Sequence, residues 1–494
     1  MIRAVAVESV RAAEAAARAS LPDGELMRRA ARGLADVAAA RLGERGGGVV
    51  VALVGGGDNG GDALYAAGLL AAGGHECSVV LVPAGGRAGV HAAGLAVAEK
   101  AGAAVVVAAK GRDAATAVLA RADVVLDGIT GIGGRPGLRA DAAALAGAVP
   151  GSAWVIAVDL ASGLDPAGRE PADLVLRADE TVTFGAPKPA HLLPSGAGAT
   201  GRLTVVDIGV DMQALPAAVE RLTLDDAARL WPVPGPGDDK YSRGVLGVVA
   251  GGEAYPGAAL LAVTAAVEAG AGMVRYVGTA TPTALVRAAV PEAVHGEGRV
   301  QAWLVGPGLD VAATGPGAAE QLDVATRTVR SDVPLVLDAG GLDLIDGRRP
   351  GATLLTPHAG ELARLLGRLE GREVARSEVE RDPVGHARRL AARTGAVVLL
   401  KGSTTVVVAA DQDVPVRSQA DAPAWLATAG AGDVLAGLIG TLLAAGLAPL
   451  DAASLGALVH GLAGDLVSRG GPLRASAVAG GIPAAVRRLL RRAS

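Results

Sequence analysis

Asp433 stands directly after a turn of small residues, Gly430-Ala431-Gly432, and directly before an apolar run with helical spacing. A glycine turn at the start of a helix leaves backbone N–H groups free, and the helix dipole adds partial positive charge there, so the turn is suited to bind phosphate. A carboxylate beside bound phosphate can take a proton from an attacking hydroxyl group. By itself, an Asp in a first helical turn is better explained by its favourable interaction with the dipole, so the neighbouring motifs must decide.

Three other loops in the second half carry groups that suit a nucleotide site. Gly306-Pro307-Gly308, Thr356-Pro357-His358-Ala359-Gly360-Glu361 and Lys401-Gly402-Ser403-Thr404-Thr405 each follow a short apolar run. Taken singly, a histidine or lysine in such a loop is explained as a turn residue or a solvated side chain, and a glutamate as charge at a helix start. In combination with the turn at 430–433, the loops predict a phosphoryl-transfer site.

In the first half, oxygen-bearing side chains follow three expected strands. Gly55-Gly56-Gly57-Asp58-Asn59-Gly60-Gly61-Asp62 comes after the apolar run 49–54, while Asp127 and Asp159 each end a later run, with Ser162 close behind. Carboxylates and amides beside glycine N–H groups can coordinate a cation and hold a polar ligand together. Asp, Asn and Gly also form tight turns for conformational reasons alone. Because the carboxyl ends of parallel strands meet at one sheet edge, we expect these groups to form a site.

The elements that must position these residues alternate between short apolar runs and helical patterns, which predicts an α/β fold with largely parallel sheets in both halves. Two amphipathic helices are expected within 7–42, separated at 21–24, and a third helix at 63–72. The expected strands lie at 49–54, 78–82, 122–127, 154–159, 183–189 and 205–209 in the first half, and within 244–252, 274–277, 302–305, 334–338 and 397–400 in the second.

Length and composition limit the class of protein. With 494 residues, two domains are expected, at 1–213 and 224–494. The 46 basic and 50 acidic residues give a net charge of −4, which offers no electrostatic basis for binding nucleic acid or a membrane surface. Cys77 is the single cysteine, which excludes an intramolecular disulfide and a cysteine-based zinc site. Apolar stretches are interrupted before they reach membrane-spanning length, and a cytoplasmic protein is expected.

The motifs of the first half resemble the three signatures of NAD(P)H-hydrate epimerase domains, over about residues 1–213 with a Rossmann-like fold. These enzymes interconvert the R and S forms of hydrated NADH and NADPH. The resemblance implies that Asp159 is the acid/base and that a potassium ion is held by Asn59, Asp127 and Ser162. It implies substrate contacts for Asp58, Asn59, Gly60, Gly61, Asp62, Gly131, Ile132, Gly133, Gly134, Arg135, Pro136, Gly137 and Asp159. Asp58 and Ala63 depart from the usual Asn and Gly of the motif.

The motifs of the second half resemble the ribokinase-like superfamily and, within it, the NAD(P)H-hydrate dehydratases, over about residues 224–490. The resemblance implies that Asp433 is the catalytic base and that Ala431 and Gly432 N–H groups stabilise the transferring phosphoryl group. It also implies a magnesium ion bound with ADP or ATP. Contacts to the hydrate are implied for Ala258, Gly308, His358 and Asp433, and contacts to the nucleotide for Lys401, Gly402, Ser403, Thr404, Thr405 and Gly432.

The sequence therefore predicts a bifunctional cofactor-repair enzyme with two α/β/α domains, in which an epimerase supplies a dehydratase that works through a phosphorylated intermediate. Its expected partners are hydrated NADH or NADPH and an adenine nucleotide, and a homo-oligomer is expected. One alternative is a ribokinase-like kinase for a vitamin or sugar, fused to a non-catalytic binding domain. A second is that the first half is an interaction module.

Overall fold

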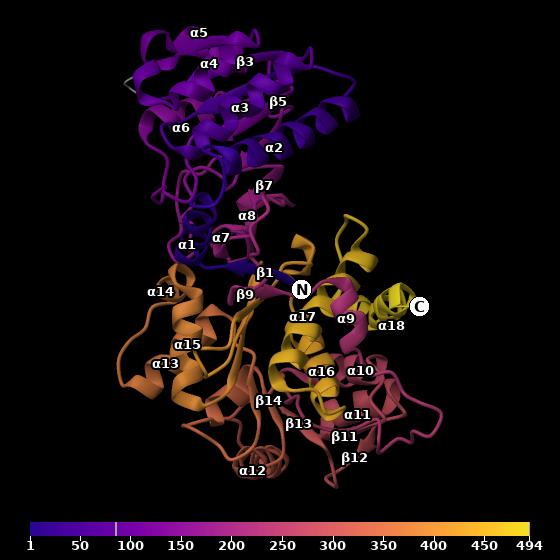
Figure 1. The fold of residues 1–494 in the computed structure, drawn as a ribbon. Helices are drawn as coiled ribbons and strands as arrows, with labels where there is room; N and C mark the ends of the chain where they lie inside the picture. The colour runs from indigo at the N-terminus through magenta and orange to yellow at the C-terminus, as the bar shows by residue number, and fades with distance from the viewer. Residues whose placement is uncertain (84–85, 494) are drawn as a thin grey trace. The chain divides into compact units, whose positions relative to one another are not determined.

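The computed structural model describes residues 1–83 and 86–493, excluding the side chains of residues 316 and 493 (Figure 1). The chain divides into two compact units, one of Arg3–Val219 and one of Glu220–Ser494 together with Met1–Ile2. Two short strands, β1 (Ile2–Val5) and β9 (Ala217–Arg221), contain the points of division. Each unit has its own sheet and its own hydrophobic core, so each is described separately.

The N-terminal unit is built on a seven-stranded sheet in which every neighbouring pair is parallel. Its central strands are nearly continuous runs of Val, Leu and Ile, as expected for a parallel sheet buried on both faces. In spatial order the strands are β4 (Ala104–Val107), β3 (Glu76–Leu81), β2 (Val49–Val54), β5 (Val124–Gly128), β6 (Trp154–Val158), β7 (Glu180–Phe184) and β8 (Arg202–Val206).

Helices cover both faces of this sheet. Alternate residues of β2 therefore belong to two different hydrophobic cores, one on each face. Val50, Ala52 and Val54 pack with α1 (Val7–Arg18), α2 (Glu25–Glu44), α3 (Asp58–Ala72) and α4 (Ala92–Lys100). Val51 and Leu53 pack with α5 (Arg112–Leu119) and α6 (Ala140–Ala146). The short helices α7 (Pro189–Leu192) and α8 (Ala197–Thr200) follow β7. The α/β/α architecture predicted for this half is confirmed.

Two predicted segments differ from the structure. The segment 58–62, expected as a loop, forms the first turns of α3. A Cβ on Gly60 would lie 2.3 Å from Gly55 O, so only glycine lets the helix begin this close to the end of β2. The expected strand 183–189 ends at Phe184, since Gly185 has φ +70° and Pro189 begins α7.

The C-terminal unit contains a larger, mixed sheet. Each neighbouring pair from β12 to β16 is parallel, whereas β17 pairs antiparallel with both β16 and β18. In spatial order they are β18 (Val416–Gln419), β17 (Thr405–Val408), β16 (Val397–Leu400), β15 (Thr353–Leu355), β14 (Leu335–Leu337), β13 (Ala302–Val305), β10 (Val245–Val249), β11 (Met273–Val277) and β12 (Val294–His295).

Two groups of helices cover this sheet. One face packs in a single core with α9 (Leu224–Leu230), α10 (Pro256–Glu268), α11 (Ala280–Ala289), α16 (Ala431–Ala444), α17 (Pro449–Ser468) and α18 (Ala475–Ala493). The other carries α12 (Pro316–Arg330), α13 (Ala359–Glu370), α14 (Arg376–Arg381) and α15 (Pro383–Thr394). Of the helices in the described ranges, α17 alone has the length and mean hydropathy (1.2) to span a membrane, and 72% of that window is buried within the protein.

Candidate active sites

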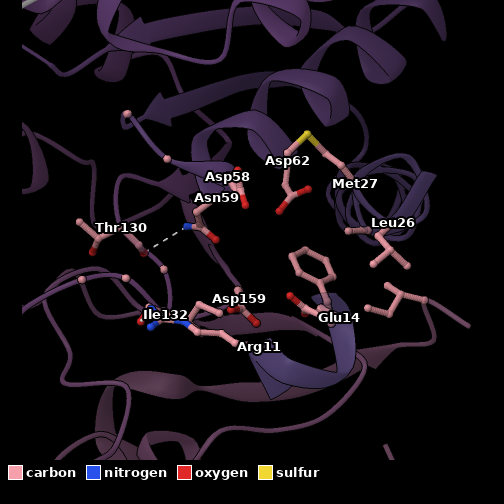
Figure 2. A pocket seen from close by; sticks show the side chains of 18 of the residues that line it. Arg11, Glu14, Leu26, Met27, Asp58, Asn59, Asp62, Thr130, Ile132 and Asp159 are labelled. Carbon is pink, nitrogen blue, oxygen red and sulfur yellow. Dashed lines mark hydrogen bonds between the residues drawn. The ribbon is translucent and has the colours of Figure 1, made fainter. Parts of the chain in front are cut away.

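A cavity of about 570 Å³ lies at the carboxyl ends of β2, β5 and β6 in the N-terminal unit (Figure 2). Its walls come from the start of α3, the loop after β5, the end of β6, and the helices α1 and α2. The predicted substrate residues that line it are Asp58, Asn59, Asp62, Gly131, Ile132, Gly133, Gly134 and Asp159.

Other predicted substrate residues do not line the cavity. Gly60 and Gly61 are buried in α3, where Gly60 packs against Gly55. Arg135, Pro136 and Gly137 lie beyond the lining part of the loop after β5, and Gly137 donates its N–H to Gly163 O at 2.8 Å.

The three predicted potassium ligands lie together around the carbonyl group of Thr130. Asn59 Nδ2 donates to Thr130 O at 3.1 Å, and Ser162 Oγ lies 3.2 Å from the same oxygen. Asp127 is fully buried and accepts from Ser162 N at 2.8 Å and from Ser162 Oγ at 2.6 Å. Burial raises the pKa of Asp127 to about 6, although the Ser162 bonds oppose the rise. Among the residues that the structure describes, this buried carboxyl group has no basic partner, and it lies beside hydroxyl, amide and carbonyl oxygens, a set that fits a monovalent cation.

Asp159 is held in a buried network that the sequence did not predict. Its Oδ1 accepts from Lys188 Nζ at 2.5 Å and from Thr183 Oγ1 at 2.8 Å, and its backbone oxygen lies 2.9 Å from His191 Nε2. Burial acts to raise the pKa of Asp159, but the Lys188 ammonium outweighs it, so this pKa lies below its ordinary value. Asp159 also has φ +63°, in the left-handed region. The network holds an anionic carboxylate at a strained backbone position beside the cavity.

His191 positions Lys188. Its Nδ1 accepts from Lys188 N at 3.0 Å, so Nε2 carries the proton and donates to Asp159 O. Burial and the neighbouring Lys188 lower the pKa of His191 to about 4. The neutral ring thus ties the end of β6 to the start of α7 without adding charge.

In the C-terminal unit, Asp433 lies in the first turn of α16, whose N-cap Gly430 has φ +84°. Ala431 N donates to Thr428 O at 3.3 Å, whereas Gly432 and Asp433 N–H make no backbone hydrogen bond to the described residues. The N–H groups of Gly432 and Asp433 are therefore the free donors of this turn. The sequence predicted those of Ala431 and Gly432, one position earlier. Burial raises the pKa of Asp433 to about 7, and Asp338 adds to the rise while Lys401 opposes it.

Lys401 connects Asp433 to the ends of the central strands. Its Nζ donates to Asp338 Oδ1 at 2.8 Å and lies 3.7 Å from Glu361 Oε2. A Cβ on Gly432 would lie 3.4 Å from the same Nζ, which places the lysine against the anion turn. Burial acts to lower the pKa of Lys401, but Asp338 and Glu361 outweigh it and raise this pKa above its ordinary value. The lysine is thus held as a cation between two carboxylates and the phosphate turn.

His358 belongs to the same strand ends, as the N-cap of α13. Its Nδ1 accepts from Gly360 N at 3.0 Å and from Glu361 N at 3.2 Å, while Glu361 Oε2 accepts from His358 N at 2.8 Å. The residue also forms a parallel bridge with Lys401. Because Nδ1 is an acceptor in the cap, Nε2 is the ring atom left to donate to a ligand.

Ala258 and Gly308 meet on the other side of the anion turn. A Cβ on Gly308 would lie 2.7 Å from Ala258 Cβ. Leu261 lies one turn further along α10. A Cβ added to Gly430 would lie 2.5 Å from Leu261 Cδ1 and 3.8 Å from Asp433 Oδ2. Together, these approaches connect the predicted hydrate contacts to Asp433 through α10.

The predicted nucleotide segment 401–405 links β16 to the antiparallel β17. Gly402 and Ser403 are exposed, Thr404 is buried, and Thr405 Oγ1 donates to Gly402 O at 3.4 Å. Two exposed residues at the tip, next to the cationic Lys401, are consistent with a loop that contacts phosphates or ribose.

Several residues around both sites were missed. Asp338 was visible as an acid at a strand end, the same signal that identified Asp127 and Asp159, and Glu361 was visible in its motif. Lys188, between two prolines, gave no such signal. Glu14 and Arg11 of α1 line the cavity from a helix far away in sequence.

Two protein-family models match the chain: one described as YjeF-related protein N-terminus, at residues 23–190, and one described as NAD(P)H-hydrate dehydratase, at residues 246–474. The bifunctional NAD(P)H-hydrate repair enzyme Nnr of Mycobacterium tuberculosis is 44% identical over 465 residues, covering 91% of this chain and 90% of that protein. The chain belongs to the family of bifunctional NAD(P)H-hydrate repair enzymes. The repair enzyme Nnr of Mycobacterium leprae is 42% identical over 477 residues, covering 93% of each chain.

Membership of the repair-enzyme family confirms the predicted resemblance in both halves of the chain. It decides against a vitamin or sugar kinase fused to a non-catalytic domain. Among solved structures, the ADP/ATP-dependent NAD(P)H-hydrate dehydratase of Bacillus subtilis, co-crystallised with ATP and Mg²⁺, matches with a TM-score of 0.48 at 26% identity. The match covers 55% of this chain and 99% of that chain.

Proposed function

We propose that this enzyme restores hydrated NADH and NADPH in two steps, with the N-terminal unit interconverting the R and S hydrates and the C-terminal unit dehydrating the S form with ADP or ATP. The observation that carries the second step is the position of Asp433 in the first turn of α16, with a pKa of about 7 and Lys401 against the same turn. A base with that pKa is substantially ionised at neutral pH while still able to hold a proton.

In the dehydratase step, Asp433 takes the proton of the ring hydroxyl group, whose oxygen then attacks the terminal phosphoryl group of the nucleotide. The P–O bond to the rest of the nucleotide breaks, and AMP leaves from ADP, or ADP from ATP. The N–H groups of Gly432 and Asp433 and the Lys401 ammonium stabilise the charge on the transferring group. Phosphate then leaves the ring far more readily than hydroxide would, and loss of a ring proton restores the double bond. Ala258, Gly308 and His358 would hold the hydrate, and 401–405 the nucleotide.

In the epimerase step, Asp159 exchanges a proton with the substrate while Lys188 keeps its carboxylate ionised in the absence of that proton. The cavity-lining residues 131–134 and Asn59 would orient the hydrate. This assignment rests on the anionic carboxylate at the cavity wall.

Two cations belong to the proposal. Potassium would be held by Asn59, Asp127 and Ser162, and when bound it would offset the buried carboxylate and fix the floor of the cavity. Magnesium would enter with ADP or ATP, where Asp338 and Glu361 are the nearest carboxylates to Lys401, and it would neutralise phosphate charge. We also propose a cytoplasmic location, where reduced nicotinamide nucleotides and ADP or ATP occur together.

The test is recovery of reduced nicotinamide. The full-length protein is incubated with mixed R and S hydrates, K⁺ and Mg²⁺, with ADP in one arm and ATP in another, and absorbance of the dihydronicotinamide ring is followed. The proposal predicts complete recovery in at least one arm, because the S form is consumed directly and the R form after epimerisation. Recovery limited to half the substrate would refute the epimerase step, and no recovery with either nucleotide would refute the dehydratase step.

A further inference from the structure

One carboxyl group in the N-terminal cavity is buried without a partner. Asp62 lies on α3, lines the cavity and is 8% exposed, and its Oδ1 accepts no hydrogen bond from any residue that the structure describes. Figure 2 shows its side chain pointing from α3 into the cavity. A desolvated carboxylate without donors is strongly unfavourable, so this group is stable only when protonated or when bound to a donor.

The other carboxyl groups near Asp62 have counter-ions. Asp58 is well exposed and lies 3.5 Å from Arg18, and Glu14 lies 3.8 Å from the same guanidinium group. Asp159 is paired with Lys188. Asp62 therefore stands alone among the acidic groups of this cavity in having no basic partner in the described chain.

The surroundings of Asp62 and Asp159 shift the pKa values of the two carboxyl groups in opposite directions. Burial raises the pKa of Asp62 well above its ordinary value, Asp159, Asp58 and Glu14 raise it further, and Arg18 opposes them. From α2 the cavity receives the uncharged Leu26, Met27 and Ala30. The pKa of Asp159, in contrast, is lowered overall because Lys188 outweighs burial. Two carboxyl groups of one cavity whose environments push their pKa values apart form the pattern of an acid and a base.

Epimerisation of the hydrate by loss and return of water requires both an acid and a base. This inference rests on the epimerase function proposed above. In a dihydronicotinamide ring, the ring nitrogen donates electrons into the neighbouring double bond, so hydration places the hydroxyl group on the carbon next to that nitrogen. The R and S forms differ at this carbon. Inversion through loss and return of water needs an acid for the departing oxygen and a base for the incoming water, on opposite faces of the ring.

We propose that Asp62 is the catalytic acid of the epimerase, protonating the hydroxyl group that departs from one face while Asp159 deprotonates the water that adds to the other. In the close-up, the two side chains enter the cavity from different walls, α3 and the end of β6 (Figure 2). A flat ring bound between them exposes one face to each carboxyl group.

The step is balanced. The proton of Asp62 moves to the hydroxyl oxygen, the C–O bond breaks, and water leaves as the nitrogen lone pair forms a C=N⁺ bond. A second water adds to the opposite face, the C=N⁺ electrons return to nitrogen, and one proton of that water passes to Asp159. Proton exchange with solvent then restores neutral Asp62 and anionic Asp159. In the reverse direction Asp159 is the acid and Asp62 the base.

The first experiment measures interconversion of the purified R hydrate into S by NMR, using the full-length protein without ADP or ATP so that dehydration is idle. Asp62→Asn keeps the size and polarity of the side chain but has no acidic proton. We expect kcat to fall by about 10²–10⁴-fold, the usual contribution of a positioned acid, with KM within about threefold of wild type. Asp62→Glu, which restores an acid, should recover part of the rate.

Glu14→Gln is the matched comparison, since Glu14 lines the same cavity and burial also raises its pKa, although it has Arg18 beside it. Its kcat should fall by less than about tenfold. In wild type, kcat should decrease at high pH as Asp62 loses its proton, and this decrease should be absent in Asp62→Asn. An Asp62→Asn kcat within about threefold of wild type, or an equal loss in Glu14→Gln, overturns the proposal.

The second experiment uses wild type alone and stands even if the variants fold poorly. Interconversion in H₂¹⁸O should place one solvent oxygen in the product for each inversion, above the rate without enzyme. Inversion with retention of the original oxygen overturns the proposal, because it requires a route that keeps the C–O bond. Failure of wild type to interconvert the epimers at all would instead refute the epimerase function on which the inference rests.

Discussion

At the scale of single residues, Asp433 combines two conditions that a base needs near neutral pH. It lies at a helix start, a position suited to phosphate, and its carboxyl group is half-buried, so that desolvation and the Asp338 charge bring its pKa to about 7. The Lys401 ammonium opposes this rise of the Asp433 pKa. The same helix start without these neighbours would hold an ordinary ionised Asp.

The first prediction is a pH profile for dehydration of the S hydrate. Since the base must be unprotonated, kcat/KM should rise with pH and reach half its maximum near the pKa of the free enzyme, about 7. In Asp433→Asn the rise should disappear and the rate should fall by about 10²–10⁴-fold, while nucleotide affinity measured by calorimetry stays within about threefold. A rate that is flat from pH 5 to about 9 in wild type would contradict Asp433 as the base.

The second prediction concerns Lys188, which is 1% exposed and paired with Asp159. Lys188→Met leaves the carboxylate without its counter-ion, and breaking such a buried pair costs about 3–5 kcal/mol. Urea unfolding followed by hydrogen exchange in peptides from residues 3–219 would measure the loss. Peptides from 220–493 serve as the internal control, and their protection should not change.

The stability that Lys188→Met loses should depend on pH and should be smaller in acid. The pKa of Asp159 is lower in the folded protein than in the unfolded chain, so its contribution to stability is present above the unfolded pKa. It disappears as the pH falls through the folded pKa. The difference between wild type and Lys188→Met should therefore shrink in acid; a difference that grows would refute the pairing as its cause.

At the scale of elements, both sites depend on helices that begin very close to a strand or to another helix. In the N-terminal unit, Gly60 allows α3 to start against the end of β2, which puts Asn59 and Asp62 at the cavity. In the C-terminal unit, α16 packs along α10 with Gly437 at the crossing, where a Cβ would lie 2.2 Å from Ala262 O. The position of the anion turn follows from this crossing.

The third prediction tests that crossing with two Gly→Ala changes in helices. Gly437→Ala should destabilise the C-terminal unit by about 1–3 kcal/mol, because the methyl group meets backbone that cannot move independently. Gly480→Ala, in α18 with open space around it, should stabilise the unit by about 0.5–1 kcal/mol through helix propensity. Denaturant unfolding of the two variants measures both. Equal effects would show that the α10–α16 approach is not close.

At the scale of the whole molecule, each unit has its own hydrophobic core and its own candidate active site. The two sites are expected to perform different reactions on the same substrate. Loss of the epimerase site should therefore leave dehydration intact, and loss of the dehydratase site should leave epimerisation intact. In a variant of one site, the activity of the other unit therefore serves as an internal control.

The fourth prediction is a crossed pattern in two full-length variants. Asp159→Asn should still dehydrate the S hydrate at the wild-type rate but should leave the R hydrate unconsumed. Asp433→Asn should restore reduced cofactor about 10²–10⁴-fold more slowly than wild type from either epimer, yet should still equilibrate R with S. NMR of both epimers with and without ADP or ATP distinguishes the outcomes. If Asp159→Asn consumed R as fast as S, the epimerase assignment to the first unit would be wrong.

The sequence by itself determined the α/β class of both units and the residues that end their strands. Buried parallel strands must be continuous apolar runs, and ligands bind where those strands end, so Asp127, Asp159 and Lys401 could be recognised from local pattern. The Gly-Ala-Gly-Asp turn was equally visible, because its conformation depends on glycine and helix start signals that are close together in the chain.

Only the tertiary structure decided which charges face one another. Lys188 reaches Asp159 across 29 positions and Lys401 reaches Asp338 across 63, and no local pattern encodes such distances. The pKa shifts follow from burial and from these partners, which is why the pKa of Asp62 is raised while that of Asp159 is lowered. Residue types are local properties of a sequence, but the electric environment of each residue is created by folding.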